Sequence, residues 1–198
     1  MKFFLFILIS VLGLVYEAKA QDEHYFPADN TNSKTLNSAL GYRLYSMELS
    51  AMKEPVLYND TSKNEIYRFS WFRSFDDPIA IRIEKSKDTY LLYWKSCYNK
   101  VDKPMALLID ERKIIDKATW DLFKDKLKKL AYWKMDTNDP PEPGTIRLDG
   151  SNWILEGKTA TKYHVVDRWS PDSKSKYYQC CDYLIGLTDL NIPPRGKY

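Results

Sequence analysis

The chain contains few of the residues on which common catalytic and metal sites depend. It has only two histidines and three cysteines among 198 residues. Patterns for a nucleophile elbow (G-x-S-x-G), a zinc protease (H-E-x-x-H), a dithiol (C-x-x-C), a P-loop and a dinucleotide fold (G-x-G-x-x-G) are all absent from the sequence. We therefore expect no cofactor and no metal ion.

An excess of charge of one sign is also missing. Thirty Lys and Arg residues stand against 27 Asp and Glu residues, which gives a net charge of +3. Nucleic acids and anionic membranes attract strongly basic proteins, and this balance supplies no such attraction. We expect no nucleic acid among the partners of the protein.

Long hydrophobic runs are missing beyond the first residues of the chain. Lys2 is followed by an apolar segment over 3–16, and Ala18-Lys19-Ala20 forms an A-x-A cleavage site before Gln21. This order is typical of a signal peptide, and the apolar segment is shorter than the roughly 20 residues of a membrane span. The sequence predicts a signal peptide over 1–20 and a soluble mature chain, secreted or periplasmic, with no membrane span.

Cys97, Cys180 and Cys181 leave two alternatives open. An oxidising compartment permits a disulfide from Cys97 to either member of the doublet, with one thiol left over. The other alternative is that all three are buried thiols that behave as small hydrophobic residues.

Alternating apolar residues indicate an antiparallel meander in the first half of the chain. Ile79, Ile81 and Ile83 share one face of a strand, and aromatic or β-branched residues surround them in the sequence. The segment 39–58 fits a helix or a strand, and 21–38 is expected to be a flexible N-terminal segment. Strands are predicted near 64–74, 79–84, 89–97 and 105–111.

Two helices are predicted from caps and from helical spacing. Asp116 stands at an N-cap position, and the apolar residues behind it recur at helical intervals from Trp120 to Leu130. This helix is expected over Lys117 to Trp133. A second helix near 175–187 would bury the cysteine doublet.

Between these helices the segment 152–168 is predicted to be a hairpin that turns near Gly157. Strands, helix, hairpin and helix follow one another in separate blocks. That order favours an α+β fold with a mainly antiparallel sheet packed against about two helices. Residues 39–198 are expected to form one domain.

The hairpin carries the best candidates for chemistry, Glu156, His164 and Arg168. If Glu156 lies opposite His164, all three side chains share one face, and an acid–base row results. If the register slips by one, Glu156 faces Tyr163 and the row is broken.

A structural interpretation of the same residues competes with the catalytic one. In it, Asp149 and Ser151 build a turn, and Glu156 pairs with Arg168 across the strands. Trp153, Arg168 and Trp169 are the candidate binding residues, because aromatic residues and arginine are common anchors of interfaces.

The segments D-G-S-N-W-I-L-E at 149–156 and Y-H-V-V-D-R-W-S-P at 163–171 resemble a group of uncharacterised bacterial proteins. These share D-G-x-x-W-x-L-E and Y-H-x-V-x-R-W-S-P, and the resemblance covers about residues 105–190. It implies a secreted or periplasmic bacterial origin, but neither an activity nor a functional residue.

We expect a non-enzymatic binding or inhibitor-like protein whose partner is a protein, a glycan or another small molecule. The alternative is a small hydrolase-like enzyme that uses Glu156, His164 and Arg168. It requires these three side chains to converge in a pocket, whereas the binding function requires an exposed aromatic patch or groove.

Overall fold

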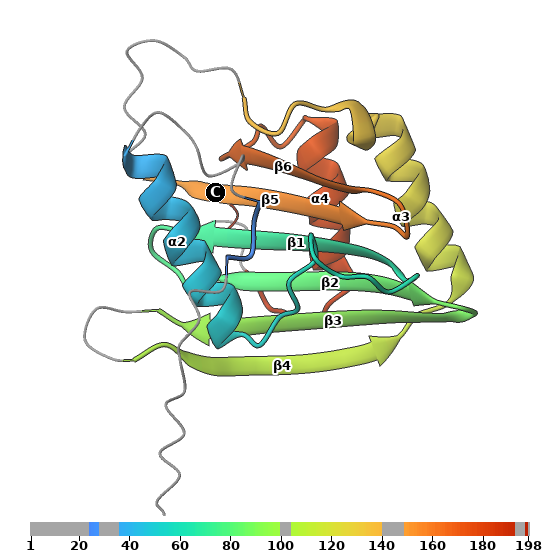
Figure 1. Cartoon of the computed structure of the whole chain (residues 1–198), viewed down its shortest axis with the longest axis horizontal. Coiled ribbons are helices and arrows are strands. Elements are labelled where there is room, and N and C mark those ends of the chain that lie inside the picture. The colour runs from blue at the N-terminus through green and yellow to red at the C-terminus, as the bar shows by residue number, and fades with distance from the viewer. Residues whose placement is uncertain (1–23, 28–35, 100–103, 140–148, 193–196, 198) are drawn as a thin grey trace, which may run out of the picture.

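A computed structural model of the chain describes residues 24–27, 36–99, 104–139, 149–192 and 197, without the side chains of 36–40. In this part of the chain a six-stranded antiparallel sheet carries helices on both faces (Figure 1). The predicted α+β class is confirmed. The predicted signal peptide lies outside the described residues.

The sheet is open, and its strands follow the order β4-β3-β2-β1-β5-β6. The predicted meander forms its first four strands, and the predicted hairpin adds the last two beside β1. The bounds of the strands are β1 Glu65–Arg73, β2 Ile79–Ser86, β3 Thr89–Tyr98, β4 Ala106–Ile114, β5 Ser151–Lys158 and β6 Tyr163–Trp169.

One long helix lies in front of the sheet and two lie behind it, as Figure 1 shows. The front helix is α2, Leu36–Ala51, and the others are α3, Lys117–Leu130, and α4, Lys176–Gly186. Asp116 caps α3 as predicted, because its Oδ1 accepts a hydrogen bond of 2.7 Å from Thr119 N. No helix in the described ranges has the length and apolar character needed to cross a bilayer.

The helix α3 ends three residues earlier than predicted. Ala131 adopts a left-handed conformation with φ 55°, and its amide donates to the carbonyls of Leu127 and Lys128. These bonds terminate the helix, because a left-handed residue turns the chain away from the helix axis. A short 3₁₀ helix, Tyr132–Lys134, follows.

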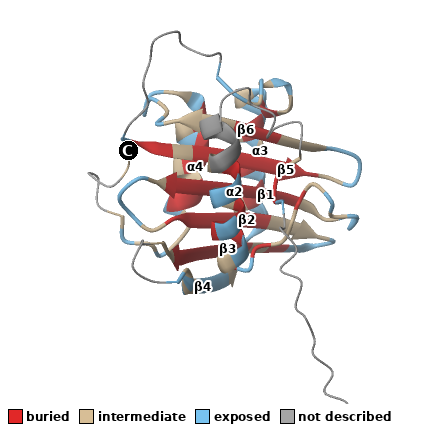
Figure 2. Cartoon of the chain, turned by 60° about the vertical axis from the view of Figure 1, so that its left-hand side comes forward, coloured by how far each residue is buried: buried red, intermediate tan, exposed pale blue. Residues whose placement is uncertain are grey.

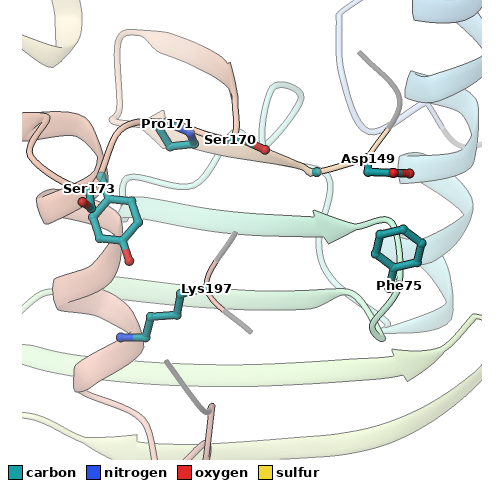
Figure 3. Close-up of a pocket in the computed structure, with 8 residues that line it drawn as sticks. Phe75, Asp149, Ser170, Pro171, Ser173 and Lys197 are labelled. Atoms are coloured by element: carbon teal, nitrogen blue, oxygen red, sulfur yellow. The ribbon is translucent and has the colours of Figure 1, made fainter. Parts of the chain in front are cut away.

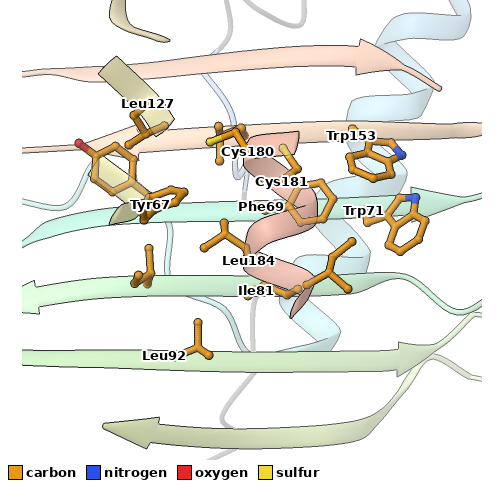
Figure 4. Packing of buried hydrophobic residues seen from close by; sticks show 14 of the residues in the cluster. Tyr67, Phe69, Trp71, Ile81, Leu92, Leu127, Trp153, Cys180, Cys181 and Leu184 are labelled. Carbon is orange, nitrogen blue, oxygen red and sulfur yellow. The ribbon is translucent and has the colours of Figure 1, made fainter. Parts of the chain in front are cut away.

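Each face of the sheet has its own hydrophobic core. The core behind the sheet packs α3 and α4 against aromatic residues of β1 and β5, among them Phe69, Trp71 and Trp153 (Figure 4). The core in front packs α2 against Phe72 and Ile154. Buried residues therefore run along the middle strands, as Figure 2 shows.

Of the segment 21–38, which was predicted to be flexible, the structure describes only residues 24–27 and 36–38, and the rest lies outside the described residues. Tyr25 and Phe26 are buried in the front core, and Tyr25 Oη donates a 2.8 Å hydrogen bond to Glu54 O. The helix α2 already begins at Leu36. These contacts join residues that are far apart in the sequence, so no local sequence pattern could predict them.

The turn of the hairpin also differs from the prediction. Gly157 lies inside β5, and the turn forms at 159–162, where Thr159 N donates to Lys162 O at 2.9 Å. A Cβ atom at Gly157 would lie 2.7 Å from Tyr132 Cε1 and 2.8 Å from Tyr67 Cε1. Glycine is needed here for the close approach of two rings, not for a turn.

The three cysteines are buried and free. Cys97 belongs to the core in front of the sheet, whereas Cys180 and Cys181 belong to the core behind it. Because the sheet separates them, Cys97 cannot pair with the doublet. Of the two alternatives, the structure supports buried thiols.

Candidate functional site

The predicted acid–base row does not form, because β5 and β6 pair in neither of the two expected registers. Glu156 lies opposite Val165, and Gly157 lies opposite His164. Residues opposite each other in a ladder point to the same face, and neighbours along a strand point to opposite faces. Glu156 therefore faces α2, whereas His164 and Arg168 face the other side of the sheet.

Glu156 binds Arg68 of β1. Arg68 Nε donates to Glu156 Oε2 at 2.7 Å, and Nη2 lies 2.6 Å from the same oxygen. Tyr163 Oη donates to Oε1 at 2.9 Å. The side chains of Arg68 and Glu156 are fully buried. This arrangement replaces the predicted ion pair between Glu156 and Arg168, because Arg68 is the cross-strand neighbour of Glu156.

The buried pair belongs to a larger group of charges in front of the sheet. Glu54 Oε2 lies 3.7 Å from Arg68 Nη1 and 3.0 Å from Arg82 Nε. Lys95 Nζ lies 3.6 Å from Glu54 Oε1. Burial by itself would lower the pKa of Arg68, but the carboxylates of Glu156 and Glu54 raise it, so the guanidinium stays charged. Such a group holds elements in place, and its burial leaves no access for a substrate.

His164 lies against aromatic rings instead of beside a carboxylate. Its ring centroid is 5.2 Å from that of Tyr132 and 6.3 Å from that of Trp133. Burial lowers the pKa of His164, so the neutral imidazole is favoured. A neutral histidine packed among rings fits a structural role.

Arg168 holds the segment before the hairpin. Its Nε lies 3.0 Å from Asp139 Oδ1, and its Nη1 donates to Thr137 O at 3.0 Å. Of the other two candidate binding residues, Trp153 is completely buried and stacks on Tyr178 at 4.7 Å between centroids. Trp169 is half-buried.

A surface hollow lies where the ends of the hairpin meet the β1–β2 turn and the start of α4 (Figure 3). Its volume is about 440 Å³. We call it the Phe75 pocket, and its lining residues are Phe75, Asp149, Gly150, Ser170, Pro171, Ser173, Tyr178 and Lys197.

Hydrogen bonds between strand ends fix the base of the Phe75 pocket. Ser74 Oγ donates to Gly150 O at 2.8 Å, and Ser151 N donates to Ser170 Oγ at 3.0 Å. Gly150 has φ 154°, and a Cβ atom there would lie 2.5 Å from Ser170 Oγ. Only glycine fits this position without displacing its neighbours.

The pocket combines apolar rings with polar groups of both charges. Phe75 is 69% exposed, and Tyr178 and Pro171 add further apolar surface. Asp149 and Lys197 supply opposite charges, and Lys197 Nζ lies 2.6 Å from Asp182 Oδ1. Among the described residues, no three His, Cys, Asp or Glu side chains gather in a way that could hold a metal ion.

The sequence motif contains half of this pocket. Asp149 and Gly150 begin the first of the two segments that resemble the bacterial group, 149–156, and Ser170 and Pro171 end the second, 163–171. Phe75 and Tyr178 were missed, because they lie in a loop and in a helix that no pattern connects with the hairpin. No family model matches the chain, and no curated protein matches it either. The resemblance to a bacterial group therefore stays a prediction.

Proposed function

We propose that this protein is a secreted or periplasmic binding protein without catalytic activity, and that the Phe75 pocket holds a glycan. The signal-peptide pattern at residues 1–20 supports the location. The group of bacterial proteins that its hairpin resembles supports a bacterial origin.

One observation carries the proposal: Phe75 is largely exposed at the rim of a pocket that also contains charged and hydroxyl groups. Ligand pockets join apolar surface with a few polar groups that orient the ligand, and their volumes begin at about 300 Å³. A sugar ring has an apolar face for an aromatic side chain and hydroxyl groups for Asp149, Ser170 and Ser173.

The alternative hydrolase loses its geometric basis. Glu156 and His164 lie on opposite faces of the sheet, and Glu156 is buried against Arg68. A general base must come within hydrogen-bonding distance of a substrate, and the burial of Glu156 prevents this.

Saturation-transfer NMR with a panel of monosaccharides and oligosaccharides tests the proposal. We expect the mature protein to bind at least one member of the panel, and Phe75→Ala to lose that binding. The melting temperature should hardly change, because Phe75 is exposed. Leu122→Ala is the matched control, since Leu122 is 49% exposed on α3, away from the pocket.

Two results would contradict the proposal. One is the absence of binding to every sugar in the panel, and the other is equal binding by the wild type and by Phe75→Ala. The location has a separate test, which is N-terminal sequencing of the protein exported by a bacterial host. We expect the mature chain to begin at Gln21.

A further inference from the structure

The two edges of the sheet differ in how they are covered. Beside β6, Asp167 N donates to Thr137 O at 2.7 Å, and the side chain of Arg168 binds the same carbonyl. At the other edge, β4 is the last strand, and no strand of the described residues pairs with its outer side (Figure 1). An open edge strand presents backbone donors and acceptors to any chain that fits it.

The direction of the backbone groups follows from one hydrogen bond. Ile115 N donates to Tyr90 O of β3 at 3.0 Å. Backbone groups alternate in direction along a strand, so those of Glu111 and Lys113 also point to β3. The amides and carbonyls of Asp110, Arg112 and Ile114 therefore point outward.

The charges of β4 are ordered along the strand. Asp110 and Glu111 come first, and Arg112 and Lys113 follow. An antiparallel second copy of β4 would place this acidic half against a basic half. A parallel copy would oppose like charges, and a peptide of one charge would meet repulsion in one half of the strand.

We propose that β4 is a self-association surface, which pairs antiparallel with β4 of a second copy around a twofold axis at Glu111. Asp110 of each copy then lies opposite Arg112 of the other. The register between β3 and β4 shifts between Ser96 and Cys97, which leaves Leu108 in an irregular part of β4, so the regular pairing covers only the later residues of the strand. Within it, the register pairs the charges and brings Ile114, which is 76% exposed in the single chain, against the strand of the second copy.

Neighbouring registers fit less well. The outward-pointing backbone groups of β4 would also allow the twofold axis to lie at Asp110 or at Arg112. Each of these axes would place the residue on the axis opposite its own copy, so that two like charges would meet. The axis at Arg112 would also oppose Ile114 to Asp110. In the proposed register the only like-charged pair is Glu111 with its own copy, and Lys113 of the second copy lies diagonal to each Glu111.

The proposal does not depend on the Phe75 pocket. That pocket is formed at the β1–β2 turn and at the ends of β5 and β6, whereas β4 is the strand at the opposite edge of the sheet. The interface is a single edge-to-edge ladder, smaller than the interface of a permanent dimer. We therefore expect a dimer that dissociates on dilution.

Charge reversal tests the pairing on the mature chain by sedimentation equilibrium. The variants Asp110→Arg and Arg112→Asp should each be monomeric. In each variant, residues 110 and 112 carry the same charge, so like charges would face each other at both of the 110–112 pairs that the twofold axis creates. Mixed one to one, the two variants should form a heterodimer, since every Arg then meets an Asp. The double variant should regain the homodimer.

Two controls make the result decisive. Asp110 lies 3.5 Å from Lys95, so thermal melts must show that each variant is folded. Lys128→Asp reverses an exposed charge on α3 and should leave the dimer intact. A wild type that stays monomeric up to about 1 mM overturns the proposal. So does a dimer that survives both single reversals, or variants that fail to associate when mixed.

Discussion

Arg68 and Glu156 form a fully buried ion pair, although 88 positions separate them in the sequence. The pair joins β1 to β5, and so it connects the meander to the hairpin. Burying charges is costly, and their attraction offsets this cost only while both partners are present.

Removing one partner of this pair should therefore destabilise the fold. We expect Glu156→Leu to lower the free energy of unfolding by about 3 kcal/mol, because the buried guanidinium of Arg68 then keeps a hydrogen bond to Pro55 O but has only the more distant carboxylate of Glu54 to balance its charge. The double variant Arg68→Met/Glu156→Leu should lose less, since no unpaired charge remains at this position. Urea denaturation at neutral pH measures both. A double variant less stable than Glu156→Leu would show that the ion pair is not the reason.

Glu48 should make stability depend on pH. Burial raises its pKa from 4.5 to about 8, a hydrogen bond from Asn99 opposes the shift, and its Oε2 has no hydrogen-bond partner among the described residues. The folded state thus holds a proton that the unfolded chain releases. The resulting stabilisation is complete below pH 4.5, declines as the pH rises towards 8, and is lost above that.

The variant Glu48→Gln isolates this effect, because its neutral amide has a similar shape and does not titrate. Its stability relative to the wild type should increase between pH 4.5 and 8, by about 1.4 kcal/mol per pH unit at most. Chemical denaturation at several pH values measures the difference. Parallel curves for the two proteins would contradict the raised pKa.

The glycines of β5 and α4 give a matched pair of substitutions. Gly157→Ala should cost about 1–3 kcal/mol, because its methyl group would overlap the rings of Tyr132 and Tyr67. Gly186→Ala should be neutral or stabilise by up to about 1 kcal/mol, since Gly186 lies in α4 with nothing within 4 Å of the added carbon. Thermal melts compare them. Equal losses would refute the steric explanation at Gly157.

The thiols should be unreactive in the folded protein. Burial raises the pKa of Cys97 and of Cys180 to about 12, and that of Cys181 well above its ordinary value. Thiolates are the reactive form, so a thiol reagent at pH 7.5 should label none of the three natively and all three in denaturant. Rapid labelling of the native protein would show that one of these sites opens to solvent.

Local patterns in the sequence determined the fold class and most of the helices and strands. Alternation in 79–83 specified a strand, and Asp116 with the apolar spacing behind it specified the start of α3. The predictions from these features were correct because each feature depends on residues that are neighbours in the sequence. The helix α2 was left undecided, because it buries Ser46 and Glu48 and exposes Leu44 and Met47, which hides its helical periodicity.

Only the tertiary structure decided where Glu156 points and what it binds. Strand side chains alternate with a period of two, so the position of the turn at 159–162 instead of Gly157 determines which residues share a face. The pairing of β5 with β1 then supplied Arg68 as its partner, and the same arrangement brought Phe75 and Tyr178 to the ends of the hairpin. Such contacts depend on packing between distant segments, and local sequence patterns do not encode them.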